Sequence, residues 1–292
     1  MKKIFTILLL LSSLAYSSMR VETTFTTFGV ITKKIGADLV NVHVLASPKY
    51  DPHFIVPKPS LLAKLRRADL LIMNGGGLEI GWLPPLIRGA NNANIQNGAK
   101  GFLDISHFIP MIDLPTSVSR GFGDVHAEGN PHYTVNPHMV PIIAKAIAQK
   151  LESLDSDNMM EYEKNLEVFL EEWKNYLMKF DAKMGECKDK KVVQYHELFN
   201  YFLKRYNYKS FGNIERLPGV APSSKHTISI INSIKKNGIK RILQDVYHER
   251  KTAKFIASKT DAKVVVIPHD VGADGSKSLE EFYDKIAKQI CR

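Results

Sequence analysis

The chain has 292 residues, of which 44% are hydrophobic and 24% are charged, and this composition excludes a disordered or fibrous protein. The chain is too long to fold around one small hydrophobic core, so we expect two lobes. The formal net charge is +10, which is basic enough to consider nucleic acid as a partner. The lysines and arginines are scattered, however, without interleaved aromatic residues or a known nucleic-acid-binding motif, so we expect no nucleic-acid binding.

The N-terminal segment has the three parts of a secretory signal. Lys2 and Lys3 precede an apolar run at residues 4–11, and small residues follow up to Ser17. We expect residues 1–18 to be removed by cleavage after Ser17 or Ser18. No later apolar run approaches about 18 residues, so we expect a soluble, periplasmic mature chain. No cysteine follows the apolar run, which predicts no lipid anchor at the cleavage site.

The two cysteines, Cys187 and Cys291, leave two interpretations open. An oxidising compartment favours one disulfide that would staple the end of the chain to the second lobe. Two unpaired thiols are the alternative, because the sequence does not show that the side chains meet. A CxxC motif is absent from the sequence.

The first half of the mature chain alternates strand and helix patterns. We expect strands at residues 21–27, 39–46 and 70–73, with helices at residues 28–35 and 59–67. Residues 110–137 are rich in Gly, Pro, His and polar side chains and should form a long loop, of a kind that is often functional. A helix is expected at residues 137–151.

Residues 158–184 carry the strongest pattern in the chain, with no proline or glycine. Apolar residues recur mostly every three or four positions and predict one stripe along a single long helix: Tyr162, Leu166, Phe169, Leu170, Trp173, Leu177, Phe180 and Met184. We interpret this helix as a rigid strut between the lobes. The alternative is a long helix packed on one domain.

A second alternating series follows the long helix. Strands are expected at residues 192–195, 209–212, 241–243 and 263–267, with helices at 197–206, 224–236, 249–260 and 279–290. Alternation of this kind predicts α/β architecture with two Rossmann-like lobes, each a mainly parallel sheet flanked by helices. We expect a first lobe at residues 19–154, the connecting helix at 155–186 and a second lobe at 187–292.

Four of the ten histidines fall where ligands bind in such sheets. His53, His132, His196 and His269 each follow a predicted strand or lie in a neighbouring loop. The carboxyl ends of parallel strands carry ligand sites, so these histidines can meet between the lobes. A tetrahedral set of imidazoles suits Zn²⁺.

Two further residues compete for a place in this site. Asp270 follows His269 and could either ligate the metal or orient an imidazole from behind. We expect His126, in the long loop, to lie at the surface, and a place beside the same ion is the alternative.

Several motifs together resemble a known family, the periplasmic zinc and manganese binding proteins of ABC transporters (ZnuA-like or TroA-like, the cluster A-I solute-binding family). They are Asp51-Pro-His53, Asn130-Pro-His132 followed by Asn136-Pro137, the strand end at His196, and the uninterrupted helix. The resemblance implies two α/β lobes on one backbone helix and a metal held by His53, His132, His196 and one acidic residue. Matching Gly272 to the family pattern places His269 at the acidic position, and a one-residue shift places Asp270 there.

The resemblance also implies function. We expect a solute-binding protein, not an enzyme, that captures Zn²⁺, with Mn²⁺ as an alternative, and delivers it as a monomer to an ABC permease. Rival interpretations are a secreted zinc hydrolase, with Glu197 as a conceivable base, and an adhesin or metal chaperone on the same fold. The chain lacks the long His/Asp/Glu-rich loop of several zinc-specific members.

Overall fold

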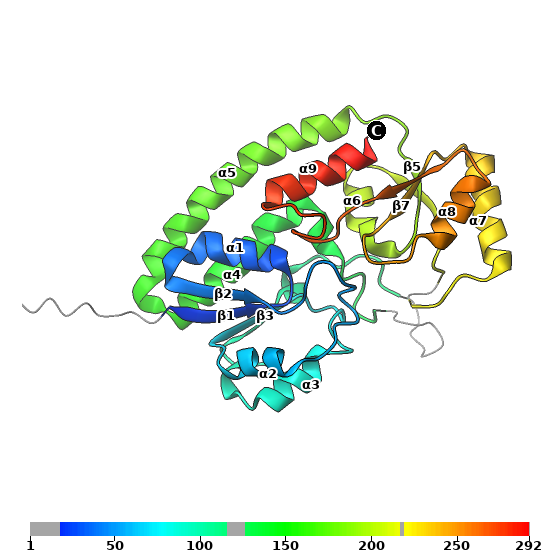
Figure 1. The fold of residues 1–292 in the computed structure, drawn as a ribbon. Helices are drawn as coiled ribbons and strands as arrows, with labels where there is room; N and C mark the ends of the chain where they lie inside the picture. The colour runs from blue at the N-terminus through cyan, green and yellow to red at the C-terminus, as the bar shows by residue number, and fades with distance from the viewer. Residues whose placement is uncertain (1–17, 116–125, 217–218, 292) are drawn as a thin grey trace, which may run out of the picture.

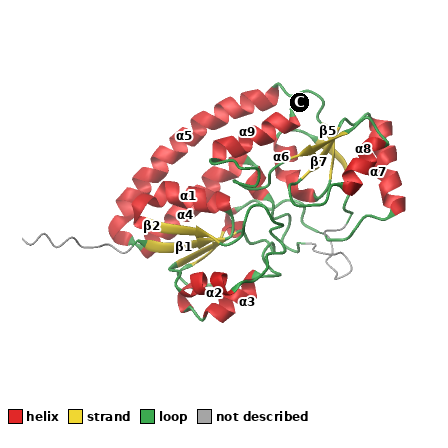
Figure 2. Cartoon of the chain, in the orientation of Figure 1, coloured by secondary structure: helices red, strands yellow, loops and turns green. Residues whose placement is uncertain are grey.

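The computed structural model describes residues 18–115, 126–216 and 219–291 (Figure 1). The predicted signal residues 1–17 lie outside the described residues. Two separate four-stranded sheets form the centres of two lobes (Figure 2), with strand orders β2-β1-β3-β4 and β6-β5-β7-β8. Every strand pair in them is parallel. The predicted two-lobed α/β fold is therefore confirmed.

The first lobe follows the predicted alternation of strands and helices. Its elements in chain order are β1 (Met19–Thr23), α1 (Thr26–Gly36), β2 (Val40–Val44), α2 (Pro59–Arg66), β3 (Leu70–Met73), α3 (Leu83–Ala90), β4 (Phe102–Asp104) and α4 (Val140–Leu154). We had not predicted α3, which starts with two prolines in its first turn, nor the three-residue strand β4. Both are too short for a clear period.

The second lobe repeats the strand order of the first. Its elements are β5 (Lys191–Gln194), α6 (Asn200–Arg205), β6 (Lys209–Asn213), α7 (Ser224–Asn237), β7 (Arg241–Gln244), α8 (Lys251–Ser258), β8 (Lys263–Val266) and α9 (Leu279–Ile290). The predicted bounds of α9 match the structure. Ser278 caps this helix, because its hydroxyl accepts a hydrogen bond from the Glu281 amide at 3.2 Å.

The predicted long helix is α5 (Met159–Gly185), which runs along one side of the molecule (Figure 1). Tyr162, Phe169, Trp173, Phe180 and Met184 from the predicted stripe are buried. They join one apolar core that contains residues of α1, α4, α6 and α9. The helix thus packs against elements of both lobes, which restricts their relative movement.

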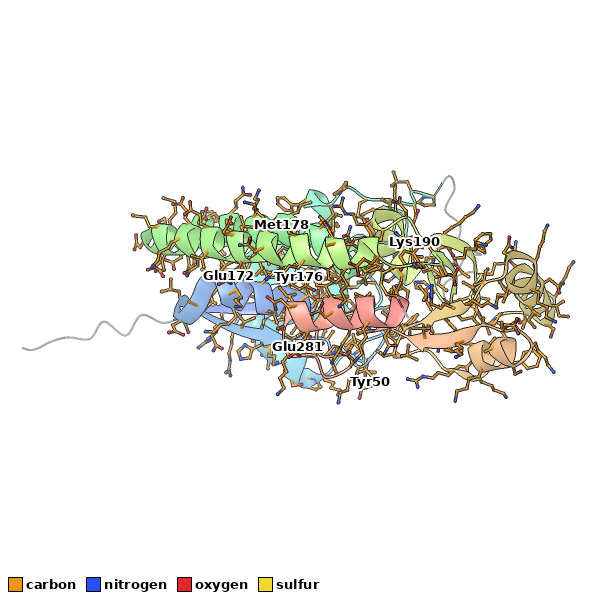
Figure 3. All side chains as sticks on the ribbon, turned by 90° about the horizontal axis from the view of Figure 1, so that it is seen from above. Tyr50, Glu172, Tyr176, Met178, Lys190 and Glu281 are labelled. Carbon is orange, nitrogen blue, oxygen red and sulfur yellow. A yellow bond between two sulfur atoms is a disulfide. The ribbon has the colours of Figure 1, made fainter. Side chains whose placement is uncertain are left out.

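Helix α9 lies beside α5 in a view from above (Figure 3), where Tyr176 faces α9 and Met178 points away. The Tyr176 hydroxyl donates to the Glu280 carbonyl at 3.3 Å. A disulfide joins Cys187, just after α5, to Cys291 at the end of α9, with 5.0 Å between the Cα atoms. The predicted disulfide, which anchors the end of the chain, is present.

One strand prediction was wrong at its end. The β-branched run at residues 21–27 predicts a strand throughout, but β1 ends at Thr23 and α1 begins at Thr26. The carboxylate of Asp270, which is distant in sequence, accepts hydrogen bonds from the backbone amides of Thr26 and Thr27. These bonds fix the start of the helix at Thr26. Within the described ranges, no helix combines the length and hydrophobicity needed to cross a bilayer.

Candidate metal centre

Three of the four predicted histidines converge between the lobes. His53 lies in the loop after β2, His132 lies before a short 3-10 helix (Tyr133–Val135), and His196 follows β5. One ring nitrogen from each lies within 4.8 Å of those of the other two. All three side chains are buried. Two come from the first lobe and one from the second, so the tertiary arrangement of the lobes creates the group.

His126 approaches this group from the long loop. Its Nε2 lies 3.1 Å from Nε2 of His53, and its ring centroid lies 5.9 Å from that of His132. A second pair has the same separation, with 3.1 Å between Nε2 of His132 and Nε2 of His196. Two nitrogens bound at about 2.0–2.1 Å to a tetrahedral Zn²⁺ lie about 3.3 Å apart. Both pairs therefore have nearly the spacing that one ion requires.

The loop that carries His53 is held in place by its own motif. The Asp51 carboxylate contacts Nδ1 of His53 at 2.7 Å and accepts the His53 amide at 3.0 Å. The buried Trp82 indole donates to the Pro52 carbonyl at 2.9 Å. Since a carboxylate only accepts, Nδ1 carries the proton and Nε2 of His53 keeps a free lone pair for a metal.

The loop that carries His132 is tied to both lobes through Asn130. The Asn130 side-chain oxygen accepts the His132 amide at 2.9 Å, and its side-chain nitrogen donates to the Glu197 carbonyl of the second lobe at 2.9 Å. Asn74 fixes the same loop by donating to the Pro131 carbonyl at 3.0 Å. These bonds hold His132 where the lobes meet.

His196 is oriented by Glu215, which the sequence analysis did not identify. Oε2 of Glu215 lies 2.8 Å from Nδ1 of His196. His248 lies behind this pair, with Nε2 at 3.8 Å from Glu215 Oε1 and Nδ1 at 2.7 Å from Asp245. No local motif marks Glu215, because it follows the neighbouring strand β6.

The electrostatics of the centre favour neutral rings at His126 and His132. Desolvation by burial lowers the pKa of His126 to about 3 and holds the pKa of His132 well below its usual range, with further lowering by the other histidines. For Asp51, burial alone would raise the pKa, but the hydrogen bond and charge of His53 outweigh it and lower the pKa. Neutral rings beside ionised carboxylates are the form that binds a cation.

A small cavity of about 30 Å³ adjoins the group, lined by Asp51, His53, Phe54, His196, Glu215, Gly219 and His248. This volume exceeds the roughly 10–15 Å³ that a cavity needs to hold one water molecule. Its walls come from both lobes and carry carboxylates and imidazoles. The cavity therefore admits a single small ion or water next to the histidines.

His269 and Asp270 occupy different surroundings from the three converging histidines. His269 is 4% exposed, its Nδ1 has no hydrogen-bond partner among the described residues, and its ring lies edge to face with that of Tyr247 at 4.9 Å between centroids. Burial lowers the pKa of His269. Asp270 is 2% exposed, and its carboxylate is bonded to the start of α1 in the other lobe.

Comparison with known families and proteins agrees with the motifs. The family model described as zinc-uptake complex component A, periplasmic, matches residues 21–291. The metal ABC transporter substrate-binding lipoprotein SsaB of Streptococcus sanguinis is 25% identical, covering 94% of this chain and 90% of that protein. The zinc-binding lipoprotein AdcA of Streptococcus pneumoniae is 23% identical, covering 94% of this chain and 55% of that protein.

Solved structures with the same fold give a consistent result. A crystal structure of ZnuA superposes with a TM-score of 0.76 at 27% identity, covering 94% of this chain and all (100%) of that one. A zinc-bound deletion mutant of ZnuA has a TM-score of 0.78 at 27% identity, covering 94% of this chain and 99% of that one. A manganese-bound periplasmic metal binding protein from Candidatus Liberibacter asiaticus shares the fold, with a TM-score of 0.76 at 22% identity over 94% of this chain and 100% of that one.

Proposed function

We propose that this chain, which belongs to the family of periplasmic zinc-uptake complex component A proteins, captures a divalent transition-metal ion and delivers it to an ABC importer. The observation that carries the proposal is the convergence of His53, His132 and His196 within 4.8 Å. Buried imidazoles gathered from two lobes have no evident structural use, because each is a costly polar group in an apolar surrounding. A bound cation satisfies them together.

The proposed ligand set consists of His53, His126, His132 and His196. The two Nε2 separations of 3.1 Å support it, since both come close to the spacing around one tetrahedral ion. His269 is the competing fourth ligand, supported by its buried Nδ1, for which the described parts of the chain supply no hydrogen-bond partner. We place Asp270 outside the set, because its carboxylate already accepts four hydrogen bonds.

Zn²⁺ is the proposed cargo, and Mn²⁺ is the second candidate. An all-nitrogen set favours Zn²⁺, whereas Mn²⁺ prefers oxygen ligands. The carboxylates nearest the rings, Asp51 and Glu215, contact Nδ1 atoms and so act behind the ligands. Relatives are named for either metal: AdcA is a zinc-binding lipoprotein, and ScaA of Streptococcus gordonii is a manganese transporter lipoprotein, 30% identical over 66% of this chain.

A binding role fits the centre better than catalysis. A catalytic zinc site keeps one position open for water, and His126 would fill that position here. Glu197, the conceivable base, is engaged by the Asn213 side chain, which donates to it at 3.0 Å. We therefore favour a binding protein over a secreted hydrolase, and import over an adhesin or metal chaperone role.

The cellular setting follows from the proposed role. The mature chain would act in the periplasm as a monomer after loss of residues 1–18, and would dock on a membrane permease. Its working units would be residues 19–154, the helical region 155–186, and residues 187–292. Because α5 packs against both lobes, ion capture would involve small lobe shifts and ordering of loops, without wide opening.

The test is a metal titration of the mature chain after chelation, with Zn²⁺ and Mn²⁺ measured separately by competition with a chromogenic chelator. We expect one tight Zn²⁺ per chain, with affinity at least about 100-fold lower in His53→Ala, His132→Ala and His196→Ala. His107→Ala is the matched control, since this side chain is 72% exposed. Wild-type affinity in any of the three variants would remove that residue from the site.

The fourth ligand is decided by one further pair of variants. If His126 ligates, His126→Ala weakens Zn²⁺ binding and shifts the visible absorption of the Co²⁺-loaded chain toward three-nitrogen coordination, while His269→Ala leaves that spectrum unchanged. The opposite pattern would assign the position to His269. Absence of tight binding in the wild-type chain for either ion would overturn the importer proposal.

A further inference from the structure

We infer that Asp270 is a positioning residue that fastens the second lobe to the first by capping helix α1, an inference that rests on the proposed metal-binding function. The family pattern offers a carboxylate near this position to the metal. In this chain the structure assigns that carboxylate to another task. It holds the two lobes at the separation at which their histidines meet.

Both carboxylate oxygens of Asp270 accept hydrogen bonds from other groups of the protein. Oδ2 accepts the Thr26 amide at 2.8 Å, and Oδ1 accepts the Thr27 amide at 2.9 Å and the Thr27 hydroxyl at 2.6 Å. Oδ1 also accepts the Val271 amide at 2.9 Å. With three donors on one oxygen and 2% exposure, the carboxylate is committed to these contacts.

The contact replaces a cap that α1 lacks locally. Phe25 precedes the helix and makes no side-chain capping bond, so the first amides of α1 need acceptors from elsewhere. Asp270 supplies them across 244 residues of sequence to Thr26. The positive end of the helix dipole also favours the negative charge. The start of α1 is therefore completed only when the second lobe is docked.

This cap lies beside the segment that carries a metal ligand. The loop that begins with Asp270 passes the loop of His53, because a Cβ on Gly272 would lie 3.3 Å from Pro48 Cγ. The rings of His53 and His196 meet edge to face across the lobes, with centroids 5.8 Å apart. Their separation depends on how firmly the lobes are joined, and the cap joins them next to the site.

Removal of a residue that orients a metal ligand by a hydrogen bond commonly lowers metal affinity by about 10- to 100-fold. We expect Asp270→Asn to weaken Zn²⁺ and Mn²⁺ by the same factor, about tenfold, because no ligand atom is lost. Removal of a carboxylate ligand would instead weaken Mn²⁺ more than Zn²⁺, since Mn²⁺ prefers oxygen. The ratio of the two affinities thus separates a positioning role from ligation.

A milder variant covers the case in which Asp270→Asn folds poorly. Thr27→Val keeps the shape of the side chain and removes only the hydroxyl bond of 2.6 Å to Asp270. We expect a smaller, equal loss for both metals. Asp274→Asn is the matched control in the same loop, since Asp274 bonds the Ser276 amide and Lys285 and does not touch α1 through those bonds.

Two readouts complete the experiment. The Co²⁺-loaded Asp270→Asn chain should keep the wild-type absorption spectrum, because the coordination shell is unchanged. In the metal-free chain, the amides of Thr26 and Thr27 should exchange hydrogen faster in Asp270→Asn than in wild type. This second readout needs no metal, so it tests the cap even if the proposed metal binding fails.

The outcomes that overturn the inference are distinct. A changed Co²⁺ spectrum, or a selective loss of Mn²⁺ binding, would make Asp270 a ligand. Unchanged affinities together with unchanged amide exchange would show that the cap does not join the lobes. Equal weakening with a preserved spectrum and faster exchange at Thr26 and Thr27 is the expected result.

Discussion

Oε2 of Glu215 lies 2.8 Å from Nδ1 of His196, and both side chains are at most 7% exposed. The carboxylate accepts a hydrogen bond from Nδ1–H and leaves the Nε2 lone pair of His196 directed at the group that contains His132, 3.1 Å away. The other oxygen of Glu215 accepts the Gly219 amide at 2.9 Å. A residue outside the ligand set thereby selects the tautomer of a ligand.

Removal of this carboxylate should weaken metal binding without removing a ligand. We expect Glu215→Gln to lower Zn²⁺ affinity by about tenfold and Glu215→Ala by up to about 100-fold, because glutamine still accepts a hydrogen bond. Competition titration with a chelator measures both. Identical affinities of the two variants and wild type would contradict the role, and Glu249→Gln, an exposed carboxylate on the same lobe, is the control.

The metal-free fold should lose stability as the pH falls. Burial holds the pKa of His132 well below its usual value, so the folded chain binds fewer protons there than the unfolded chain. The contribution of His132 to the free energy of unfolding is therefore fully present above about pH 6.5, and it is lost as the pH falls toward the folded-state pKa. Thermal unfolding between about pH 7.5 and about pH 5 measures it. His132→Gln should reduce this pH dependence, and an unchanged slope would contradict the assignment.

Glu22 should show the opposite pH dependence. This residue is 2% exposed, and burial raises its pKa to about 7, although Lys64 opposes the rise. The folded chain keeps the proton, so stability is present below the ordinary carboxyl pKa and is lost as the pH rises through about 7. Glu22→Gln should therefore raise the melting temperature at about pH 8 and change little at about pH 4.5. A lower melting temperature at the higher pH would contradict the prediction.

The disulfide should stabilise the fold with little effect on the site. Cys187 and Cys291 close a loop with a sequence separation of 104, and a crosslink of this span restricts the unfolded chain. We expect the Cys187→Ser, Cys291→Ser double variant to lose about 2–5 kcal/mol of unfolding free energy. Denaturant unfolding checks this value. Zn²⁺ affinity should stay within about threefold of wild type at 25 °C, since the two sulfurs contact Lys183 and Met184 of α5 and the bridge shares no contact with the ligands that the structure describes.

Local patterns in the sequence were sufficient for the architecture. The stripe from Tyr162 to Met184 predicted α5, because a buried face repeats with the helical period whatever it packs against. The alternation of strands and helices predicted two parallel sheets. The positions of His53, His132, His196 and His269 at or near strand ends predicted a shared site, because the carboxyl ends of parallel strands face one edge. The folded chain brings the first three together.

Tertiary structure decided which side chains meet. Asp51 orients His53 from two residues away, but Glu215 reaches His196 from a neighbouring strand and has no sequence signal of its own. Asp270 follows His269, yet its carboxylate caps α1 in the other lobe and moves the start of that helix to Thr26. Periodicity records which faces are buried, whereas the pairing of polar groups from distant segments depends on how two lobes dock. For that reason the sequence alone predicted the two-lobed fold and four candidate histidine ligands, and only the folded chain decided which of them converge and what orients and joins them.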